Sequence, residues 1–391
     1  MSKLNDLMNE LCPDGVEFKK VKDVYTRIKG TPITASKMKE IETPDGEIRI
    51  FAGGKTMINA NEEDIPKANI TRVPAVLVQS RGVIDAVYCD KPFTFKNEMW
   101  AYTHEEIVSV KYLYYVLKNN IQQFRDTASG MGSLPQISLK VTEEFVLPVP
   151  PLEVQREIVH ILDYFTLLTA ELTAELTARQ QQYEYYRDLL LTFDRKSENA
   201  LTDRQRELAV EWLSLNQIAQ NCDNQRKPVT SSNREAGEYP YYGASGIVDY
   251  VSDYLFDGDY LLISEDGNNL VARNTPIAFS ITGKNWVNNH AHVLKFETYA
   301  TRRFVEFYLN SIDLSQWITG GAQPKLNQKN LNLIPIPIPS IEEQERIVSI
   351  LDRFDALCND IKSGLPAEIE AREKQYEYYR DKLLSFKELS A

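Results

Sequence analysis

Two long stretches of the chain place apolar residues in alternating steps of four and three, which is the spacing of a coiled-coil seam. Each stretch predicts a long helix whose apolar stripe cannot remain uncovered. We therefore expect the two helices to pack against each other in antiparallel fashion. The expected seam residues are Ile158, Leu162, Phe165, Leu172, Leu176, Tyr183, Tyr186 and Leu190 in the first stretch, and Ile347, Leu351, Phe354, Tyr376, Tyr379 and Leu383 in the second.

The two stretches predict helices of different continuity. Pro150 and Pro151 stand where the first helix can begin. The second stretch contains Gly364 and Pro366, so we expect its helix to break or kink near 364–366. In the first stretch Thr-Ala-Glu-Leu occurs twice, at 169–172 and 173–176. Four residues add about 6 Å to a helix, so this repeat is predicted to act as a ruler between whatever lies at the two helix ends.

The helical stretches are also copies of one another. P-P-L-E-V-Q-R-E-I-V-H-I-L-D-Y-F begins at residue 150 and P-S-I-E-E-Q-E-R-I-V-S-I-L-D-R-F at residue 339, and Q-Y-E-Y-Y-R-D follows each of them. The repeated unit is nearly half the chain, too long for a solenoid, so it indicates a tandem duplication with pseudo-two-fold symmetry. The tyrosines of the second motif (Tyr183, Tyr185, Tyr186, and Tyr376, Tyr378, Tyr379) are predicted to pack between the helices rather than to stack on bases.

The fold class expected is α+β. Two globular segments of mixed helix and strand, 1–149 and 205–338, are separated by the helical segments 150–196 and 339–388. Short apolar runs at 75–79, 260–263 and 277–281 predict strands, and 112–117 and 303–309 predict helices. The globular segments are faintly related, because 51–54 aligns with 242–245 and Pro135-Gln136 aligns with Pro324-Lys325. Elsewhere they differ strongly, which favours one fold with two different targets.

Composition narrows the class of protein. With 43% hydrophobic and 26% charged residues, the chain is typical of an ordinary soluble protein. Its four cysteines form no C-x-x-C pair, which favours a reducing, cytoplasmic setting. We expect neither a membrane span nor a signal peptide. The net charge of −12 argues against a simple basic coat protein for nucleic acids, although residues 1–150 are nearly neutral, with 19 basic and 20 acidic side chains.

Motifs for catalysis are missing from the sequence. There is no [N/D]-P-P-[F/Y] motif for amino-methyl transfer, no G-x-G-x-x-G, and no Walker A motif. Gly53-Gly54-Lys55-Thr56 imitates the end of a Walker A motif but lacks the upstream glycine, so we interpret it as a turn between strands. Any catalysis or use of ATP is therefore expected to come from partner proteins.

The clearest polar cluster is Asn288-Asn289-His290-Ala291-His292. On a strand both imidazoles would face the same way, which suits a metal, but the other two histidines are remote in sequence and we predict no metal site. Asparagine can pair with adenine and histidine can donate to phosphate. Contact with DNA and structural hydrogen bonding within the domain remain equally open for each residue. The matching stretch in the first segment, Lys96-Asn97-Glu98-Met99-Trp100, has no histidine.

Loops flanked by glycine or proline supply further candidates for contact with DNA. Arginine reads guanine, whereas lysine and glutamine can read bases or hold phosphates. Glu265 and Asp266 could accept from cytosine, or could simply form a turn. The complete set of predicted DNA-contacting residues is Lys55, Arg81, Lys96, Asn97, Arg273, Lys284, Asn288, Asn289, His290, His292, Gln323 and Lys325.

The doubled helical motif, the stretch Tyr-Tyr-Gly-Ala-Ser-Gly-Ile-Val at 241–248 and Asn-Asn-His-Ala-His at 288–292 resemble the specificity subunit of type I restriction–modification enzymes over the whole chain. The resemblance implies a non-catalytic reader of double-stranded DNA, with target recognition domains at 1–149 and 205–338, each reading half of a split asymmetric site. It implies that the helices space these domains and dock two methyltransferase subunits, which restriction subunits then join. S-adenosylmethionine, ATP and Mg²⁺ are expected on those partners, and no cofactor on this chain.

Two alternatives remain. The acidic balance favours a structural scaffold whose globular arms bind proteins rather than DNA. An enzyme with an unrecognised site is the other. Binding to DNA that weakens steeply with salt would exclude the scaffold, and methylation or cleavage of DNA by the purified chain alone would support the enzyme.

Overall fold

The computed structural model describes residues 2–65, 69–130, 134–193, 210–321, 323–360 and 362–389. The chain forms two compact units. Unit 1 comprises Met1–Thr173 together with Glu368–Ala391, and unit 2 comprises Ala174–Ala367. The predicted ends of segments at 196 and 205 lie outside the described residues. Among the described residues, no helix combines the length and the apolar character that crossing a membrane requires.

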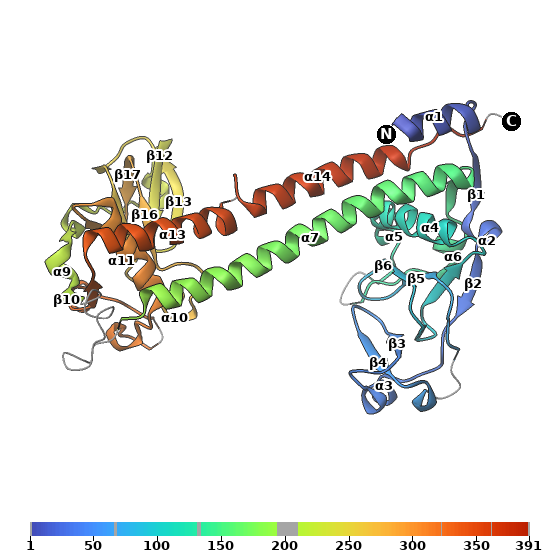
Figure 1. The fold of residues 1–391 in the computed structure, drawn as a ribbon, viewed down its shortest axis with the longest axis horizontal. Helices are drawn as coiled ribbons and strands as arrows, with labels where there is room; N and C mark the ends of the chain where they lie inside the picture. The colour runs from blue at the N-terminus through green and yellow to red at the C-terminus, as the bar shows by residue number, and fades with distance from the viewer. Residues whose placement is uncertain are drawn as a thin grey trace. The chain divides into compact units, whose positions relative to one another are not determined.

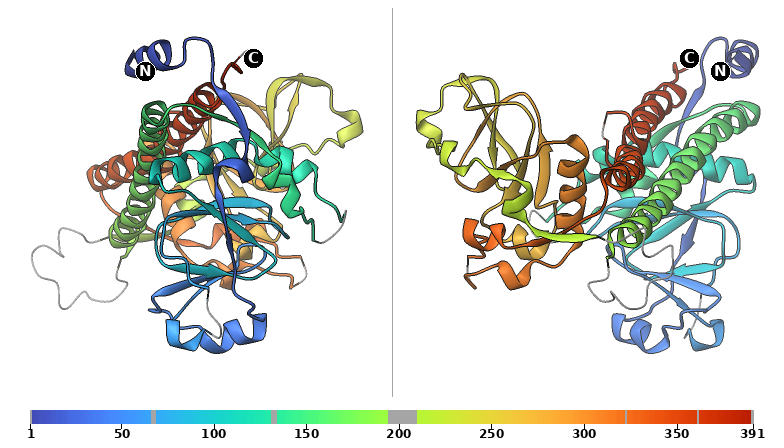
Figure 2. Two further views of the ribbon diagram at one scale, coloured as in Figure 1. Left: turned by 90° about the vertical axis from the view of Figure 1, so that its right-hand side faces the viewer. Right: turned by 60° about the vertical axis from the view of Figure 1, so that its left-hand side comes forward.

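The globular part of unit 1 consists of short strands and helices (Figure 1). Its elements are α1 (Ser2–Leu11), β1 (Glu17–Lys20), α2 (Val21–Val24), β2 (Thr26–Lys29), α3 (Ala35–Ile41), β3 (Ile48–Phe51), β4 (Met57–Ala60), β5 (Ala75–Gln79), β6 (Asp85–Cys89), β7 (Phe93–Phe95), β8 (Trp100–Thr103), α4 (Ile107–Asn119), α5 (Ile121–Asp126), α6 (Leu139–Glu143) and β9 (Val146–Val149). An antiparallel sheet of order β2-β8-β5-β6 forms its centre. Helix α4 packs on this sheet, as the left view of Figure 2 shows.

The globular part of unit 2 has a corresponding set of elements. They are β10 (Glu211–Ser214), α9 (Leu215–Ile218), β11 (Gln220–Asn221), β12 (Ala236–Gly243), β13 (Gly246–Val251), β14 (Phe256–Asp257), β15 (Tyr260–Ser264), α10 (Asn269–Ala272), β16 (Ala278–Ile281), β17 (Lys284–Val287), β18 (Ala291–Lys295), α11 (Tyr299–Ser311), α12 (Gln328–Asn332) and β19 (Pro335–Ile338). Short 3-10 turns lie at Asp223–Gln225, Ser231–Asn233 and Ser315–Trp317 in unit 2, and at Glu62–Asp64 in unit 1.

The two globular parts share one topology, which confirms the predicted duplication. The central sheet of unit 2 has the order β11-β18-β15-β16, strand for strand the counterpart of β2-β8-β5-β6. A second sheet joins an antiparallel hairpin to a parallel strand in both units, β3–β4 with β7 and β12–β13 with β17. A two-stranded ribbon closes each part, β1–β9 in unit 1 and β10–β19 in unit 2.

The repeated helical motif explains how each globular part is fixed to the helix that follows it. Helix α7 (Leu152–Leu191) follows β9, and helix α13 (Ile341–Asn359) follows β19. The buried Gln155 donates to the carbonyl of Pro150, 2.8 Å away, and Gln344 donates to that of Pro339 at the same distance. These side chains satisfy backbone acceptors where each helix begins.

An aspartate in the repeated I-L-D motif ties each helix to its domain. Asp163 accepts from Tyr115 and pairs with Lys111, both on α4. Asp352 on α13 does the same with Tyr299 and Arg303 on α11. The repeated sequence therefore fixes the attachment of each globular part, as well as the helical seam.

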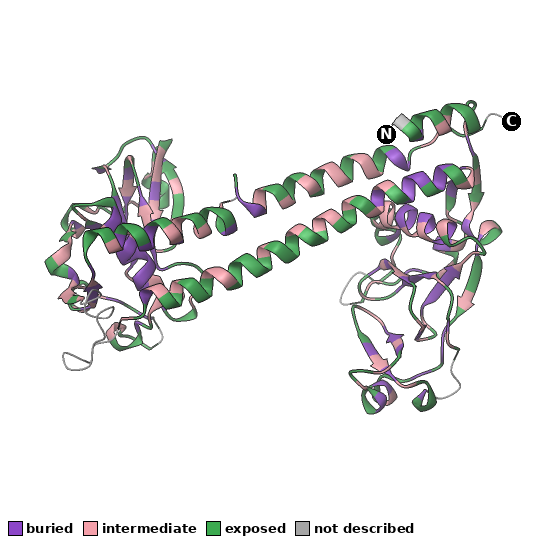
Figure 3. Cartoon of the chain, in the orientation of Figure 1, coloured by how far each residue is buried: buried purple, intermediate pink, exposed green. Residues whose placement is uncertain are grey.

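The helices pack in antiparallel pairs within each unit. In unit 1 Phe165 of α7 stacks on Tyr379 of α14 (Leu365–Leu383), with ring centroids 5.5 Å apart. In unit 2 Tyr183 and Tyr186 of α7 lie over Phe354 of α13, at 6.2 and 5.8 Å. Burial along the predicted seam is uneven (Figure 3). Ile158, Leu162, Ile347, Leu351 and Leu383 are buried, Phe165, Leu172, Leu176, Tyr183, Leu190, Phe354, Tyr376 and Tyr379 are half-buried, and Tyr186 is exposed despite its ring contact.

One tyrosine of each repeated motif departs from the prediction of core packing. Tyr185 and Tyr378 are 64% and 62% exposed, so the expectation that they lie between the helices is wrong. In a helix only residues three or four apart share a face, so the consecutive tyrosines Tyr185-Tyr186 and Tyr378-Tyr379 cannot all point inward.

The second helical stretch is broken into two helices. Helix α13 ends at Asn359 and α14 begins at Leu365, where Gly364 and Pro366 predict a break or kink. A Cβ atom at Gly364 would stand 2.5 Å from the carbonyl oxygen of Ala356. Only glycine can make this close return onto the end of α13. Helix α7, in contrast, is continuous over 40 residues, which corresponds to about 60 Å at 1.5 Å per residue.

Candidate nucleic-acid interface

In unit 1, four loops meet beside one end of the central sheet. The amide of Gly54 donates to the carbonyl of Arg81 at 3.0 Å, which joins the β3–β4 hairpin to the loop after β5. The amide of Lys96 donates to the carbonyl of Phe51 at 3.0 Å and brings in the loop after β7. The amide of Gly82 donates to the carbonyl of Pro135 at 2.9 Å, which adds the segment before α6. Predicted contact residues from separate parts of the sequence are therefore close together.

Two of these three backbone bonds recur in unit 2, and the units share a further one. Asn288 N–H donates to the carbonyl of Tyr242 at 3.0 Å, as Lys96 does to Phe51. Gly267 N–H donates to the carbonyl of Pro324 at 3.1 Å, as Gly82 does to Pro135. Leu326 N–H donates to Glu265 at 2.8 Å, the counterpart of Ile137 and Ser80 at 3.0 Å. We call this shared arrangement the loop frame.

The loop frame requires glycine at one pair of matching positions. Gly82 and Gly267 have φ values of +79° and +106°, in the left-handed region that residues with a Cβ rarely adopt. Each glycine directly follows the residue whose side chain stands at the centre of the frame. That residue is Arg81 in unit 1 and Asp266 in unit 2.

The loop frame also shows which residues of unit 1 and unit 2 occupy matching positions. Arg81 forms a backbone bridge with Gln136, and Asp266 forms one with Lys325. Because Lys96 matches Asn288, Glu98 matches His290. The pairing of Val78 with Trp100 and of Ile263 with His292 shows that Trp100 matches His292. Matching backbone positions in the two units thus carry side chains of different charge. At the central position the charges are opposite, because Arg81 is basic and Asp266 is acidic.

The predicted residues of unit 1 all lie in this frame. Lys55, Arg81 and Asn97 are exposed, and Lys96 is half-buried with its ammonium 2.9 Å from Glu98. The first three have side chains free to approach a ligand from solvent. Whether they touch DNA stays a prediction.

In unit 2 the side chains of Asn289, His290, Gln323 and Lys325 are exposed. Asn288 is only 7% exposed, and its side-chain oxygen accepts from the amide of His290 at 2.8 Å. It shapes the loop, which is the structural role left open by the sequence. The loops that carry Asp266 and residues 288–290 border an open hollow of about 750 Å³.

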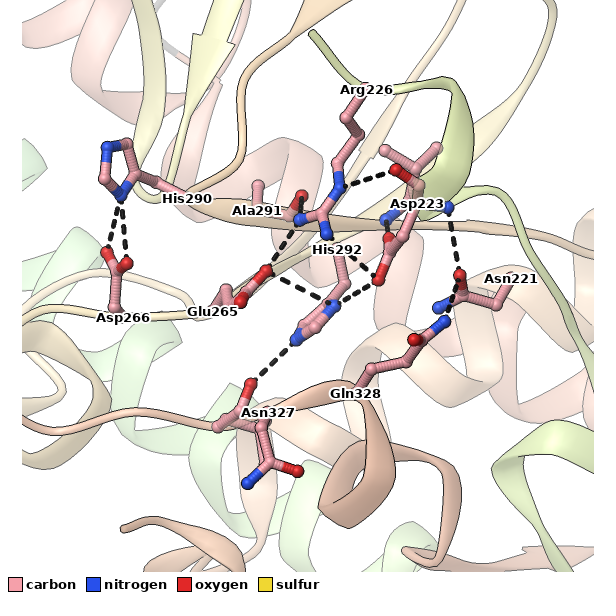
Figure 4. A network of polar contacts seen from close by, with 12 residues as sticks. Asn221, Asp223, Arg226, Glu265, Asp266, His290, Ala291, His292, Asn327 and Gln328 are labelled. Atoms are coloured by element: carbon pink, nitrogen blue, oxygen red, sulfur yellow. Dashed lines mark hydrogen bonds and ion pairs between the residues drawn. The ribbon is translucent and has the colours of Figure 1, made fainter. Parts of the chain in front are cut away.

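His292 is not a surface residue, so the prediction that it contacts DNA is wrong. Its imidazole is fully buried. Nδ1 lies 2.6 Å from a carboxylate oxygen of Asp223, and Nε2 lies 2.7 Å from the carbonyl oxygen of Leu326 (Figure 4). Strand β18 begins at Ala291, so His290 stands in the loop and His292 on the strand, and they contact different carboxylates.

Arg226 completes this buried network. Its guanidinium donates to Glu265 at 2.7 Å and to the carbonyl of Ala291 at 2.8 Å, and its Nη2 lies 3.3 Å from Asp223. Asp223, Glu265 and His292 have ligand atoms within 4.8 Å of one another, a spacing also found at metal sites. Here the positive charge among the carboxylates is supplied by Arg226, and both nitrogens of His292 have hydrogen-bond partners. The donor set is therefore suited to holding loops rather than a metal ion.

The network shifts the titration of both carboxyl groups. Burial alone would raise the pKa of Asp223, but hydrogen bonds from His292 and from the Val293 amide outweigh it, so the pKa is lowered. Burial also opposes ionisation of Glu265, whose pKa is lowered by Arg226, by the charge of His292 and by Lys325. Both groups are thus stabilised as carboxylates.

Two predicted contact residues lie outside the loop frame. Arg273 donates to the carbonyls of Leu309 and Ile312 at 3.3 and 3.0 Å, where α11 ends, so its assignment to DNA is wrong and its role is structural. Burial lowers the pKa of Arg273. Lys284 begins β17, while the frame residue Asn288 follows the other end of that strand. The ammonium of Lys284 lies over the ring of Tyr254, 4.6 Å from the centroid.

Several residues of the site were missed in the sequence. Gln136 could have been found, because the alignment of Pro135-Gln136 with Pro324-Lys325 already made it the counterpart of a predicted residue. Asp223 and Arg226 could not, because they stand about 70 residues before His292 in a segment without a recognisable motif.

Comparisons with known proteins agree with this duplicated architecture. The family model described as "Type I restriction modification DNA specificity domain" matches residues 13–179 and 209–371. The specificity subunit of the Escherichia coli type I restriction enzyme EcoR124I/EcoR124II is 35% identical over 305 residues, which are 71% of this chain and 71% of that protein. A putative type I specificity subunit from Haemophilus influenzae is 42% identical over 185 residues, 46% of this chain, and the match spans about half (48%) of that relative.

A solved structure supports the fold. The crystal structure of a type I restriction–modification S subunit from M. genitalium covers 94% of this chain and 95% of its own, with a TM-score of 0.62 and 19% sequence identity. At that identity the likeness concerns the fold alone.

Proposed function

Because the chain belongs to the type I restriction–modification DNA specificity family, we propose that it selects the DNA sequence on which a methyltransferase and restriction complex acts. The loop frame is the observation that carries this proposal. It occurs twice, with matching backbone hydrogen bonds and different exposed side chains. Two copies of one loop frame that carry different exposed side chains suit the reading of two different half-sites. Family membership does not favour the alternative of a protein-binding scaffold.

Each globular part would read one half of a split, asymmetric site in double-stranded DNA. Direct reading of bases needs side chains that reach base edges, whereas phosphate contacts mainly set position. Arg81 and Gln136 stand at the centre of the frame in unit 1, and Asp266 and Lys325 at the same positions in unit 2. Lys55, Asn97, Asn289, His290 and Gln323 surround them as further candidates for base or phosphate contacts.

The helices would dock two methyltransferase subunits, one on the helices of each unit. Tyr185 and Tyr378 occupy the same place in the motif and are 64% and 62% exposed. Leu189 in unit 2 and Tyr164 and Leu167 in unit 1 are also about 60% exposed (58%, 60% and 58%). Large exposed apolar side chains of this kind mark interfaces with other proteins. Restriction subunits would join the resulting core.

Chemistry would come from those partners. S-adenosylmethionine is assigned to the methyltransferase, and ATP and Mg²⁺ to the restriction subunits. This chain would supply sequence selection without an activity of its own. Methylation or cleavage of DNA by the purified chain alone would contradict this division of roles.

The direct test is co-expression with a methyltransferase subunit of the same type I system, followed by single-molecule mapping of methylated adenines. We expect a split, asymmetric motif that disappears when this chain is deleted. An unchanged methylation pattern after deletion would contradict the proposal. Binding to the motif should also weaken steeply as salt is raised, because phosphate contacts release counterions.

The Thr-Ala-Glu-Leu repeat tests the ruler. Helix α7 runs continuously through both copies, and deletion of 173–176 removes about 6 Å and slightly more than one turn. We expect the unspecified gap in the motif to shorten by about one or two base pairs, with both half-sites unchanged. Altered bases within a half-site would refute the ruler.

A further inference from the structure

We propose that Asp266 determines one base of the half-site read by unit 2, by accepting a hydrogen bond from the exocyclic amino group of that base. The inference rests on the proposed function and adds the chemistry of one contact. Three observations carry it: the position of Asp266 in the loop frame, the engagement of the neighbouring carboxylate, and the way in which His290 holds the side chain.

The position is central in both units. Asp266 matches Arg81, since each residue precedes the left-handed glycine of its loop. Each also forms a backbone bridge with the segment that leads into a later helix, α6 in unit 1 and α12 in unit 2. Asp266 lines the hollow of about 750 Å³, together with Asn268, Asn289 and His290. Its side chain is 33% exposed. At this position the basic Arg81 of unit 1 is thus replaced in unit 2 by an acidic residue that faces solvent.

The carboxylate of the adjacent Glu265 is not available to accept a hydrogen bond from a base. The side chain of Glu265 is only 12% exposed, and it is paired with Arg226 at 2.7 Å and with Lys325 at 3.1 Å. Both of its oxygens therefore have cationic partners inside unit 2. Of the two acids that the sequence offered for reading cytosine, only Asp266 remains accessible.

His290 holds the Asp266 carboxylate in one orientation. Its Nδ1 lies 3.0 and 2.9 Å from the two oxygens of Asp266. Each carboxylate oxygen has a second lone pair, so the group can accept from a base while it remains bound to His290. An acceptor that is oriented before binding loses less entropy when the contact forms.

The chemistry of DNA narrows what a carboxylate in this place can meet. Phosphates repel it, so it adds nothing to attachment along the backbone. Base edges offer donors at the exocyclic amino groups: cytosine N4 and adenine N6 in the major groove, and guanine N2 in the minor groove. Arg81, in contrast, presents donors only and suits the acceptor atoms of guanine. The two half-sites should therefore differ in hydrogen-bond polarity at matching positions.

The experiment combines a protein change with a base change. The complex with the methyltransferase is assembled with the wild-type chain or with Asp266→Ala, and the affinity for duplexes carrying the mapped motif is measured. At each position of the second half-site the base is replaced by an analogue without its amino group: purine for adenine, pyrimidin-2-one for cytosine, inosine for guanine. Asp266→Asn keeps an oxygen acceptor and serves as the conservative variant.

For the wild-type complex we expect one position at which the analogue weakens binding about 10- to 100-fold. Asp266→Ala should bind the analogue and the natural base within about twofold at that position, while penalties in the first half-site persist. Asp266→Asn should keep part of the penalty. The identity of the analogue distinguishes a major-groove contact from a minor-groove contact.

The matched control is Glu297→Gln. Glu297 is exposed in unit 2 and follows the end of β18 that is remote from the loop frame, so this variant should reproduce every wild-type penalty. An unchanged pattern of penalties in Asp266→Ala would overturn the inference, and so would equal weakening at all positions of both half-sites. If the wild-type complex showed no sequence preference, the proposed function itself would fail, and the inference with it.

Discussion

Units 1 and 2 use the same loop frame but support it differently. In unit 1 the position after the β7–β8 loop is Trp100, whose indole N–H donates to the buried hydroxyl of Thr142 at 2.8 Å. In unit 2 the same position is His292, held between Asp223 and a backbone carbonyl. A tryptophan has thus been replaced by an imidazole that lies in a buried network of Asp223, Arg226 and Glu265. The comparison indicates that backbone bonds and glycines preserve the frame while the side chains around it are free to diverge.

The two units differ most in the buried network of charged side chains that supports the loop frame of unit 2. Three segments contribute to its network: Asp223 and Arg226 lie before β12, Glu265 follows β15, and His292 lies on β18. Removing one member of such a buried group leaves the others without compensation. Unit 2 should therefore be more sensitive than unit 1 to single polar substitutions and to acid.

The largest expected effect is that of His292→Ala. It removes the buried hydrogen bonds of His292 to Asp223 and to the carbonyl of Leu326, which should destabilise unit 2 by about 3–5 kcal/mol. Hydrogen exchange measured residue by residue should show faster exchange in β18 and β15, and unchanged exchange in β8 and β5 of unit 1. The exposed neighbour provides the control, because His290→Ala should change the stability of unit 2 by less than about 0.5 kcal/mol. Equal losses for the two histidines would contradict the role of the network.

The frame itself should respond equally in both units. Gly82→Ala and Gly267→Ala force a Cβ into the left-handed region, at a cost of about 1–2 kcal/mol each. A Cβ would meet nothing closer than 3.4 Å at Gly82 and nothing within 4 Å at Gly267, so the backbone term should dominate. Thermal unfolding of the single variants measures this. A loss confined to one unit's glycine would show that the two frames are not equivalent.

Acid should separate the units. The pKa values of Asp223 and Glu265 are lowered from 3.8 and 4.5 in folded unit 2. A lowered folded-state pKa contributes stability that is present above the ordinary value and lost as pH falls through the folded value. Amide protection in 222–226, 264–268 and 290–293, measured relative to the intrinsic exchange rate at each pH, should therefore fall as the pH falls below about 4.5, and less steeply in Asp223→Asn.

The control for this titration lies in unit 1. There Glu144 has its pKa lowered to about 2 by hydrogen bonds from Lys20 and Lys22, but it is exposed and stands outside the four loops. The loop frame of unit 1 should therefore keep its protection over the same pH range. Parallel loss of protection in both frames would show that the network is not the cause.

The smallest effect is expected at Lys284. Its ammonium lies over the ring of Tyr254 at the surface, where such a contact is weak, and stands at the far end of β17 from the frame. Lys284→Met should lower the melting temperature slightly and leave both half-sites as they are. A changed second half-site in the methylation map would place Lys284 among the DNA contacts after all.

Most of the architecture could be predicted from the sequence because the duplicated elements are recognised from patterns among residues close together in the chain. The heptad spacing, the strand at 75–79 and the break at Gly364 depend on neighbours in the chain. The network around His292 does not. The side chain faces inward because β18 is covered on that side by segments about 70 residues before it and 34 residues after it. Arg273 was misassigned for the same reason, since the carbonyls at the end of α11 that it binds lie 36 and 39 residues later.

The central claim is that two equivalent frames read two separate half-sites. It is tested most directly by mapping methylated adenines in cells that express the methyltransferase with Arg81→Ala or with His292→Ala. We predict that Arg81→Ala relaxes or abolishes one half of the split motif and that His292→Ala affects only the other half. Loss of the same half in both variants, or an unchanged motif in both, would contradict the account.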